Sequence, residues 1–195
     1  MPQNIFAPLA RVEAKRIKSS NLIPSAVLLP VFHADNQYHV LFIKRSETVA
    51  HHKGEISFPG GVVDPEDLSC LHTALRESNE EVGIAPEDVQ VLGRLDDMET
   101  VSTGFVITPF VGLIPYPYDF RINADEIAML VIVPLDTLIA VNRDGNPAVL
   151  PGENRVPVPV FPIEGHVIWG ATARILLQFL DVIRHPFSTD IPTVT

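Results

Sequence analysis

The sequence contains very little cysteine, few charged residues and no long apolar run. Cys70 is the single cysteine among 195 residues, which excludes an internal disulfide and leaves no CxxC or Cys/His array for zinc. The apolar runs are too short to span a bilayer, and residues 1–20 lack the apolar core of a secretion signal. We therefore expect a soluble protein of a reducing compartment, located in the cytoplasm.

Basic residues are also scarce. The chain has 14 Lys and Arg against 24 Asp and Glu, which gives a formal net charge of −10. Such a surface repels polyanions at long range, which argues against nucleic acid or an anionic membrane as a partner. An anionic small-molecule ligand would need metal cations or a local basic patch. The densest basic stretch runs from Lys44 to Lys53.

Apolar residues make up 46% of the chain, which is enough for a sizeable core. We expect one domain over residues 1–195, with an arm or short helix in residues 1–20 and a Pro-rich loop region at 142–165. Helices are expected over residues 65–82 and Val167–Ile183. Alternation of strands with two helices predicts a mixed α/β layer fold. The expected strands are Ala26–Phe32, His39–Ile43, Glu55–Phe58, Val89–Leu95, Val106–Ile114 and Ile127–Val133.

The segment of residues 65–82 carries the strongest helix signals in the chain. Asp64 can cap its N-terminus with Pro65 at the first helical position, and Gly83 stands where a C-terminal glycine belongs. Leucine and valine side chains recur on one side of this helix, which predicts that this side faces the core. The other side is acidic.

Glu77, Glu80 and Glu81 lie together on that acidic side. Like charges at i,i+3 and i,i+4 repel by about 0.2–0.5 kcal/mol per pair, and the helix dipole disfavours anions near the C-terminal end. Arg76 is the only Lys or Arg in the helix. One interpretation is a solvated acidic face on a surface helix. The other is a site for a hard divalent cation such as Mg²⁺, bound through carboxylate oxygens.

Pro59, Gly60 and Gly61 precede this helix and are expected to break the preceding strand sharply. Two consecutive glycines allow close approach of the backbone or unusual dihedral angles, so that a phosphate could sit there. The alternative interpretation is a plain turn. The acidic helix directly downstream favours the phosphate.

Residues Arg76–Ile84, RESNEEVGI, together with Gly61, resemble the Nudix box, whose core is R-E-U-x-E-E-x-G-U with U apolar. Two features depart from that pattern. Asp67 stands six residues after Gly61, where the box has Glu, and eight residues instead of seven separate it from Arg76. Ser78 occupies the first apolar position.

The longer spacing also occurs in the coenzyme A pyrophosphatase branch of the Nudix hydrolases, and the segment Leu41–Asp67 resembles the upstream signature of that branch. Later segments around Phe105 and Trp169 are similar to it as well, so the resemblance covers about residues 20–185. The residues that match the upstream signature are Arg45, Ser46, His52, Gly54, Phe58, Pro59, Gly60, Gly61, Asp64 and Asp67.

The resemblance implies an α/β/α sandwich with a mixed β-sheet, in which the box forms a catalytic loop–helix–loop. It also implies hydrolysis of a nucleoside diphosphate derivative with Mg²⁺ or Mn²⁺ as cofactor. In this interpretation Glu77 and Glu81 are the first metal ligands and Glu80 is the third. Arg76 orients one of these carboxylates through an ion pair.

The resemblance leaves the general base open between a glutamate of the box, Glu126 and Glu99. It implies that the substrate is a small molecule, coenzyme A or an acyl derivative, cleaved to adenosine 3′,5′-bisphosphate and 4′-phosphopantetheine or its acyl form. Other nucleoside diphosphate derivatives and a non-catalytic nucleotide-binding module remain alternatives. Phe105 either stacks on a base or packs in the core, and Trp169 is expected to pack. The candidate substrate contacts are Arg45, His52, Gly60, Gly61 and Phe105.

Overall fold

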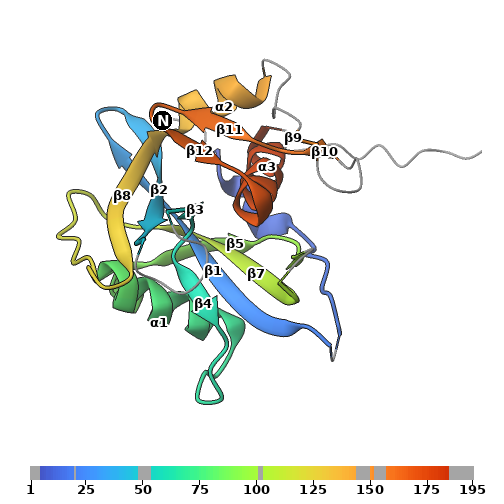
Figure 1. The fold of residues 1–195 in the computed structure, drawn as a ribbon. Coiled ribbons are helices and arrows are strands. Elements are labelled where there is room, and N and C mark those ends of the chain that lie inside the picture. Colours follow the sequence, from blue (N-terminus) through green and yellow to red (C-terminus); the bar gives the residue numbers. More distant parts are fainter. Residues whose placement is uncertain are drawn as a thin grey trace, which may run out of the picture.

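The computed structural model describes residues 5–19, 21–47, 54–100, 103–143, 150–151 and 157–184. Its centre is a mixed sheet with strand order β3-β2-β1-β7-β5, to which β4, β6 and β8 add through β1, β7 and β2 (Figure 1). The long strand β1 pairs antiparallel with β2 and parallel with β7. The strand bounds are β1 Ile23–Ala34, β2 Gln37–Arg45, β3 Ile56–Ser57, β4 Gly60–Val62, β5 Gln90–Arg94, β6 Met98–Glu99, β7 Phe105–Leu113 and β8 Ile127–Pro134.

Helices cover both faces of this sheet. Helix α1, Cys70–Val82, packs on β1 and β4, whereas α2, Leu135–Arg143, α3, Gly170–Arg184, and the short 3-10 helix η1, Ala7–Arg11, lie on the opposite side (Figure 1). The 3-10 helix η2, Pro86–Asp88, follows α1. Two small hairpins complete the described elements: β9 Leu150–Pro151 pairs with β10 Pro157–Val158, and β11 Phe161–Ile163 pairs with β12 His166–Ile168. The expected α/β/α sandwich is confirmed.

Strand β1 shows how the sequence builds two cores. Successive side chains of a strand point to opposite faces of the sheet. Leu29 and Val31 accordingly join the cluster that contains α3, whereas Ala26 and Leu28 pack with Ala74 of α1. All four β1 side chains are fully buried. The near-continuous apolar run of β1 is therefore the signature of a strand covered on both faces.

The strand predictions agree with the structure to within a few residues. The expected turn at residues 33–37 is tighter than expected, with only Asp35 and Asn36 between the two strands. Both have positive φ, 48° and 62°, as two-residue hairpin turns require. The short helix expected within residues 1–20 is η1.

Several elements differ from the expectation. Helix α1 begins at Cys70 with Ser69 as its N-cap, not at residue 65 with Asp64, and α3 begins at Gly170, three residues later than expected. The break expected at Pro59, Gly60 and Gly61 is present, but it separates two strands: β3 ends at Ser57 and pairs with β2, whereas Gly60–Val62 forms β4, antiparallel to β1. Helix α2 and the β11–β12 hairpin were not expected at all.

The helix α2 was missed because its sequence, LDTLIAVNR, carries no capping signal and includes several β-branched residues. Leu135 and Leu138 are buried in the core, and this packing holds the helix. Of the loop region expected at 142–165, residues 144–149 and 152–156 lie outside the described part of the chain. None of the helices in the described ranges has the length and apolar character needed to cross a membrane.

Candidate active site

The C-terminal end of α1 is fixed by the loop that leads from β7 to β8. Gly83 ends the helix with φ 76°, and its N–H donates to the carbonyl of Asn79 at 2.9 Å. The next carbonyls of the helix are used by the loop: Asn123 N–H donates to Glu81 O at 2.9 Å, and Arg121 N–H donates to Val82 O at 3.0 Å. The last turn of α1, which carries the glutamates, is therefore held in a defined position.

Glu81 is the buried member of the glutamate cluster, with 2% of the residue exposed. Its Oε2 accepts a hydrogen bond from the backbone N–H of Gly60 at 3.0 Å, and its Oε1 lies 3.6 Å from Nη1 of Arg45. Burial raises the pKa of Glu81 to about 8, although the Gly60 N–H and Arg45 oppose the shift. The neighbouring carboxylates of Glu77 and Glu126 raise it further. The interpretation of a wholly solvated acidic face is thus wrong for Glu81.

Glu77 lies one helical turn before Glu81, with 18% of its side chain exposed. Burial raises the pKa of Glu77, and the guanidinium of Arg76 opposes this rise. Gly61 lies directly against this carboxylate: a Cβ at residue 61 would stand 2.5 Å from Cδ of Glu77. Glycine is therefore required here for close approach, although β4 has no sharp turn.

Arg76 connects three acidic side chains. Its Nε and Nη2 donate to Oδ1 and Oδ2 of Asp67, each at 3.0 Å, and its Nη1 donates to Glu77 at 2.8 Å and Glu80 at 3.0 Å. The side chain of Asp67 is almost fully covered, and the Arg76 guanidinium holds the pKa of its carboxyl well below the usual range. The expected ion pair between Arg76 and a box carboxylate is present.

Asp67 is the residue whose importance the sequence analysis missed. The sequence marks Asp67 as a departure in spacing and as a match to the upstream signature, without a structural role, yet its carboxylate also accepts from the hydroxyl of Thr73 at 2.8 Å and the N–H of Asp64 at 2.9 Å. The available signal was charge balance, because the helix has a single arginine and Asp67 is the closest acid before it. The eight residues between Asp67 and Arg76 allow the Asp67 carboxylate, in the turn before α1, to accept hydrogen bonds from Arg76.

Glu126 reaches the cluster from the loop before β8. Its carbonyl accepts a hydrogen bond from the N–H of Ser46 at 2.7 Å, and its Oε1 accepts from Nδ2 of Asn123 at 3.3 Å. Its charge is close enough to raise the pKa values of Glu77 and Glu81. The structure therefore places the charge of Glu126 within electrostatic reach of Glu77 and Glu81.

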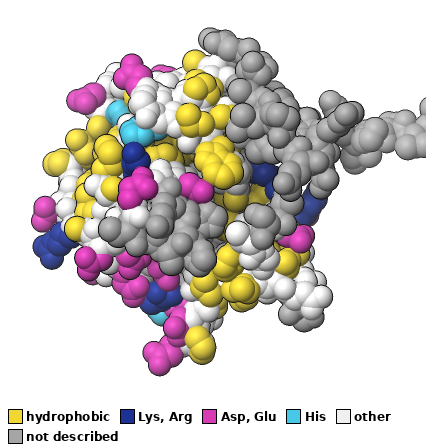
Figure 2. Space-filling model, in the orientation of Figure 1, with side chains coloured by type: hydrophobic (Ala, Val, Ile, Leu, Met, Phe, Trp, Pro, Cys, Tyr) yellow, Lys and Arg dark blue, Asp and Glu magenta, His cyan; other side chains and the backbone are white. Residues whose placement is uncertain are grey.

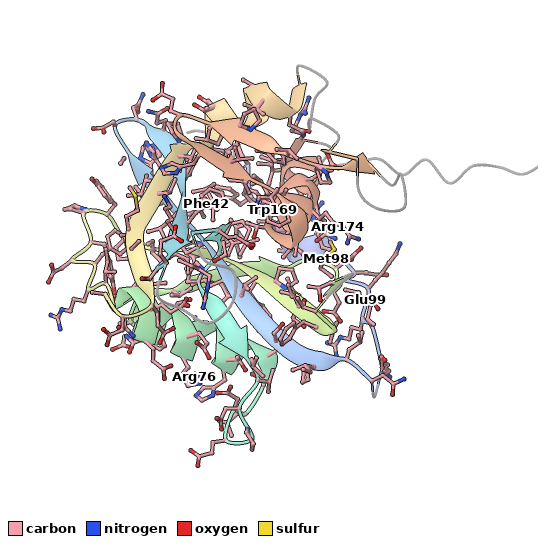
Figure 3. All side chains as sticks on the ribbon, in the orientation of Figure 1. Phe42, Arg76, Met98, Glu99, Trp169 and Arg174 are labelled. Atoms are coloured by element: carbon pink, nitrogen blue, oxygen red, sulfur yellow. The ribbon has the colours of Figure 1, made fainter. Side chains whose placement is uncertain are left out.

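Glu99, the other loop acid considered, lies on β6, where its carbonyl accepts from Nη1 of Arg174 at 3.3 Å. Figure 3 shows Glu99, Met98, Arg174 and Trp169 on the side of α3, apart from Arg76 on α1. Trp169 is 46% exposed, so the expectation that it packs in the C-terminal helix is wrong. The chain leaves the β12 strand at this residue, before α3 begins.

Of the remaining candidate substrate contacts, two lie at the glutamate cluster. Arg45, the last residue of β2, and Gly60 of β4 both contact Glu81. Phe105 begins β7 beside Ile23 and is partly buried, which leaves its two interpretations open. His52 lies outside the described residues.

The cluster has the donor chemistry of a site for a hard divalent cation. Mg²⁺ and Mn²⁺ prefer carboxylate oxygens, and Glu77, Glu80 and Glu81 supply them beside two arginines. The mutual repulsion of these carboxylates and the burial of Glu81 are costs that a divalent cation would remove, so the residues fit such an ion. Across the described ranges, no three His, Cys, Asp or Glu side chains already converge as a metal cage.

The surface around the cluster is strongly acidic. Figure 2 shows acidic side chains gathered over the region of α1, with basic side chains among them. A cavity of about 720 Å³ lies at the C-terminal end of α1, between this helix and the β7–β8 loop. Glu80 lines this cavity together with Tyr118 and Asn123. An anionic ligand can approach this region only if cations offset its charge.

Comparison with known proteins gives a consistent result. The NUDIX domain model matches residues 22–150. A protein named Uncharacterized Nudix hydrolase NudL from Pectobacterium atrosepticum is 40% identical over 154 residues, or 79% of either chain, and its namesake from Photorhabdus laumondii is 36% identical over 170 residues, 87% of this chain and 89% of that one. A crystal structure of a MutT/nudix family protein from Enterococcus faecalis has a TM-score of 0.56 at 15% identity, over 90% of this chain and 66% of that one, which supports the fold.

Proposed function

The chain belongs to the Nudix family and is a Nudix hydrolase, and from this premise we propose that it cleaves the diphosphate of coenzyme A or of an acyl derivative. The products are adenosine 3′,5′-bisphosphate and 4′-phosphopantetheine or its acyl form. The proposed cofactor is Mg²⁺ or Mn²⁺, and the proposed location is the cytoplasm. We further propose that residues 1–195 act as one domain.

The observation that supports hydrolysis at this place is the burial of Glu81 among Glu77, Glu126 and Arg45. A plain surface helix would leave its charged residues in water, where exposed ion pairs contribute only about 0–1 kcal/mol. Here a carboxylate is kept buried beside other carboxylates, at a cost to stability. Such arrangements are characteristic of functional sites.

The roles proposed for these residues follow from their positions. Glu77 and Glu81 would hold the cation through their carboxylate oxygens, with Glu80, which is more exposed, as the third ligand. The cation, when bound, supplies charge neutralisation at the diphosphate and lowers the pKa of a bound water. Arg76 holds Glu77 by a hydrogen bond, and Asp67 holds Arg76 in the same way. A chain of hydrogen bonds therefore connects the turn before α1 to the site.

Hydrolysis requires a proton acceptor for the attacking water. The oxygen of that water forms a bond to one phosphorus, the bridging P–O bond breaks, and its electron pair leaves with the departing phosphate. We propose that a carboxylate oxygen of Glu126 accepts the proton of the water, because Glu126 lies at the cluster and Glu99 lies on β6 beside Arg174.

The choice of coenzyme A rests on the signature residues upstream of α1. Arg45, Gly60 and Gly61 belong to that signature, and all three lie against Glu77 or Glu81. His52 and Phe105 complete the proposed substrate contacts on the strength of the sequence. Coenzyme A also carries a 3′-phosphate, which distinguishes it from other nucleoside diphosphate derivatives.

The test is product analysis by chromatography. The purified protein is incubated with Mg²⁺ or Mn²⁺ and, separately, with coenzyme A, dephospho-coenzyme A, ADP-ribose and NADH. Release of adenosine 3′,5′-bisphosphate from coenzyme A, much faster than cleavage of the other three, supports the proposal, and the Glu81→Gln variant is the control for a contaminating hydrolase. Preference for another substrate would discard coenzyme A. Absence of cleavage would favour a non-catalytic binding module.

A further inference from the structure

Arg45 stands at a place where its charge meets the proposed metal ligands. It ends β2, and the register between β2 and β8 shifts between Lys44 and Arg45. The register skips Ala128, so the extra residue of this bulge lies on β8, opposite Arg45, and bulges of this kind recur beside active sites. The backbone on both sides is tied down, because Arg45 N–H donates to Glu55 O at 3.0 Å and Ser46 N–H donates to Glu126 O at 2.7 Å.

Arg45 and Glu81 lie close together without forming a hydrogen bond. Nη1 lies 3.6 Å from Oε1 of Glu81, longer than the 2.7–2.9 Å of a charge-assisted hydrogen bond. The Nε of Arg45 is buried and has no hydrogen-bond partner among the described residues. The side chain of Arg45 keeps 25% of its surface exposed, whereas that of Glu81 keeps 3%. Arg45 thus faces Glu81 from the open side of the site without using its full donor capacity.

The two oxygens of Glu81 have different surroundings. Oε2 is held by the N–H of Gly60 at 3.0 Å, and Oε1 is the oxygen that faces Arg45. A divalent cation held through Oε1 would need the space beside this oxygen that the guanidinium of Arg45 now faces. Two cations cannot share that place in a partly buried site, because their repulsion is only weakly screened there.

We propose that Arg45 and the divalent cation compete for Glu81, and that the guanidinium displaced by the cation donates its hydrogen bonds to the diphosphate of the substrate. The inference rests on the proposed function and adds a residue role to it. The anionic oxygens of a diphosphate suit the planar donor fork of arginine. They also provide a partner for the buried Nε. Arg45 therefore recognises the diphosphate and not the 3′-phosphate.

The test measures Mn²⁺ binding to the full chain without substrate, by calorimetry or electron paramagnetic resonance. In Arg45→Gln, the dissociation constant for Mn²⁺ is expected to fall about fivefold, the size expected when a partly exposed charge pair is removed. Arg45→Lys keeps the charge and should bind Mn²⁺ close to the wild-type level. Arg121→Gln is the matched control, because Arg121 lies on the loop that caps α1 and its side chain is 83% exposed.

A double-mutant cycle tests whether Arg45 affects Mn²⁺ binding through Glu81. In a Glu81→Gln background, Arg45→Gln should no longer tighten Mn²⁺ binding, because the shared partner is gone. Arg45→Gln should also lower kcat/KM for coenzyme A and for dephospho-coenzyme A by the same factor. Unchanged or weaker Mn²⁺ binding in a folded Arg45→Gln variant would overturn the competition, and a loss confined to coenzyme A would overturn the diphosphate contact. A wild-type protein that neither binds Mn²⁺ nor cleaves any diphosphate would instead overturn the proposed function.

Discussion

Arg76 and Asp67 form a bidentate ion pair, with Nε–Oδ1 and Nη2–Oδ2 distances of 3.0 Å each. The pair joins the middle of α1 to the turn that precedes it, and 1% of the Asp67 side chain is exposed. The same guanidinium reaches Glu77 through Nη1. A carboxylate outside the helix thereby determines where a proposed metal ligand inside the helix is placed.

Replacement of Asp67 by Asn should lower the free energy of unfolding by about 2 kcal/mol, because Arg76 loses charge-assisted hydrogen bonds to Asp67 while it keeps those to Glu77 and Glu80. Urea denaturation at neutral pH measures this loss. Asp64→Asn is the control, because Asp64 lies in the same turn and its side chain accepts only from the N–H of Glu66 among the described residues. A loss of equal size in both variants would contradict the special role of the ion pair.

The same pair predicts a pH dependence of stability. The hydrogen bonds from Arg76 hold the pKa of Asp67 well below its ordinary value of 3.8, so at acidic pH the unfolded chain binds a proton that the native chain does not. The stabilisation is complete above the ordinary pKa and is lost as the pH falls below about 4 towards the lowered value. The difference in unfolding free energy between wild type and Asp67→Asn should therefore shrink in that range. A difference in unfolding free energy that stays constant down to the lowest pH would contradict this prediction.

The glutamates of α1 should differ in importance according to burial. Glu81→Gln removes a proposed ligand that is held in one orientation by Gly60 N–H, and we expect turnover to fall by about 100-fold or more. Glu80→Gln should have a much smaller effect, because 56% of the Glu80 side chain is exposed. Steady-state kinetics at saturating Mg²⁺, with circular dichroism to verify folding, compares the two. Equal losses would contradict the ranking.

Gly61 should be intolerant of any side chain because of Glu77. A Cβ at residue 61 would lie 2.5 Å from the carboxylate carbon of Glu77, so Gly61→Ala must displace that side chain. A displacement of about 1 Å can lower turnover by about 100-fold. Gly165→Ala is the control: Gly165 has φ 72° and open space around its would-be Cβ, so that substitution costs about 1 kcal/mol of stability and leaves kcat unchanged. Normal kcat in Gly61→Ala would refute this contact.

The start of α1 illustrates why the sequence analysis misplaced an element. Asp64 and Pro65 are good N-terminal helix signals, but the Asp64 carboxylate accepts from Glu66 N–H, and Asp67 N–H donates to Asp64 O. The segment therefore forms a local turn, which brings Asp67 to Arg76, and the helix starts later. Propensity alone does not distinguish these outcomes, because the deciding contact joins residues nine positions apart.

Ser69 should therefore be the N-cap whose removal matters. Its hydroxyl accepts from His72 N–H at 3.2 Å, and its backbone is extended, with φ −170° and ψ 165°. Ser69→Ala is expected to lower the free energy of unfolding by about 1 kcal/mol, and Ser69→Asp should retain most of the stability. Chemical denaturation measures both. A neutral Ser69→Ala variant would contradict the assignment.

The box glutamates and the strands of the sheet were predictable because each signal is local: hydrophobic period, turn residues and the spacing of acids along one helix. How these elements come together to form the site was not predictable from local signals. Arg45 and Glu126 lie 36 and 45 residues from Glu81, and only the antiparallel pairing of β2 with β8 places Ser46 N–H on Glu126 O. The register of that pair is specified by which side chains of the two strands are buried, and a single sequence does not reveal this residue by residue.

Mutation of Glu126 and of Glu99, the two acids outside the helix considered as general base, should have clearly different effects on kcat. Glu126 lies close enough to Glu77 and Glu81 to raise their pKa values, and its loop is bonded both to the end of α1 and to β2. Glu99 lies on β6, on the side of α3 (Figure 3). Glu126→Gln should lower kcat by about 100-fold or more, the usual effect of removing a general base, whereas Glu99→Gln should stay close to wild type.

The discriminating measurement is the rate of a single turnover, which reports the chemical step without product release. In Glu126→Gln this rate should fall while Mn²⁺ binding stays close to that of the wild type, because the residue is proposed to accept a proton and not to hold the ion. Glu126→Asp keeps a carboxylate and should recover part of the rate. If Glu99→Gln is the slow variant instead, the base lies on β6 and the substrate must reach across from α1 towards α3.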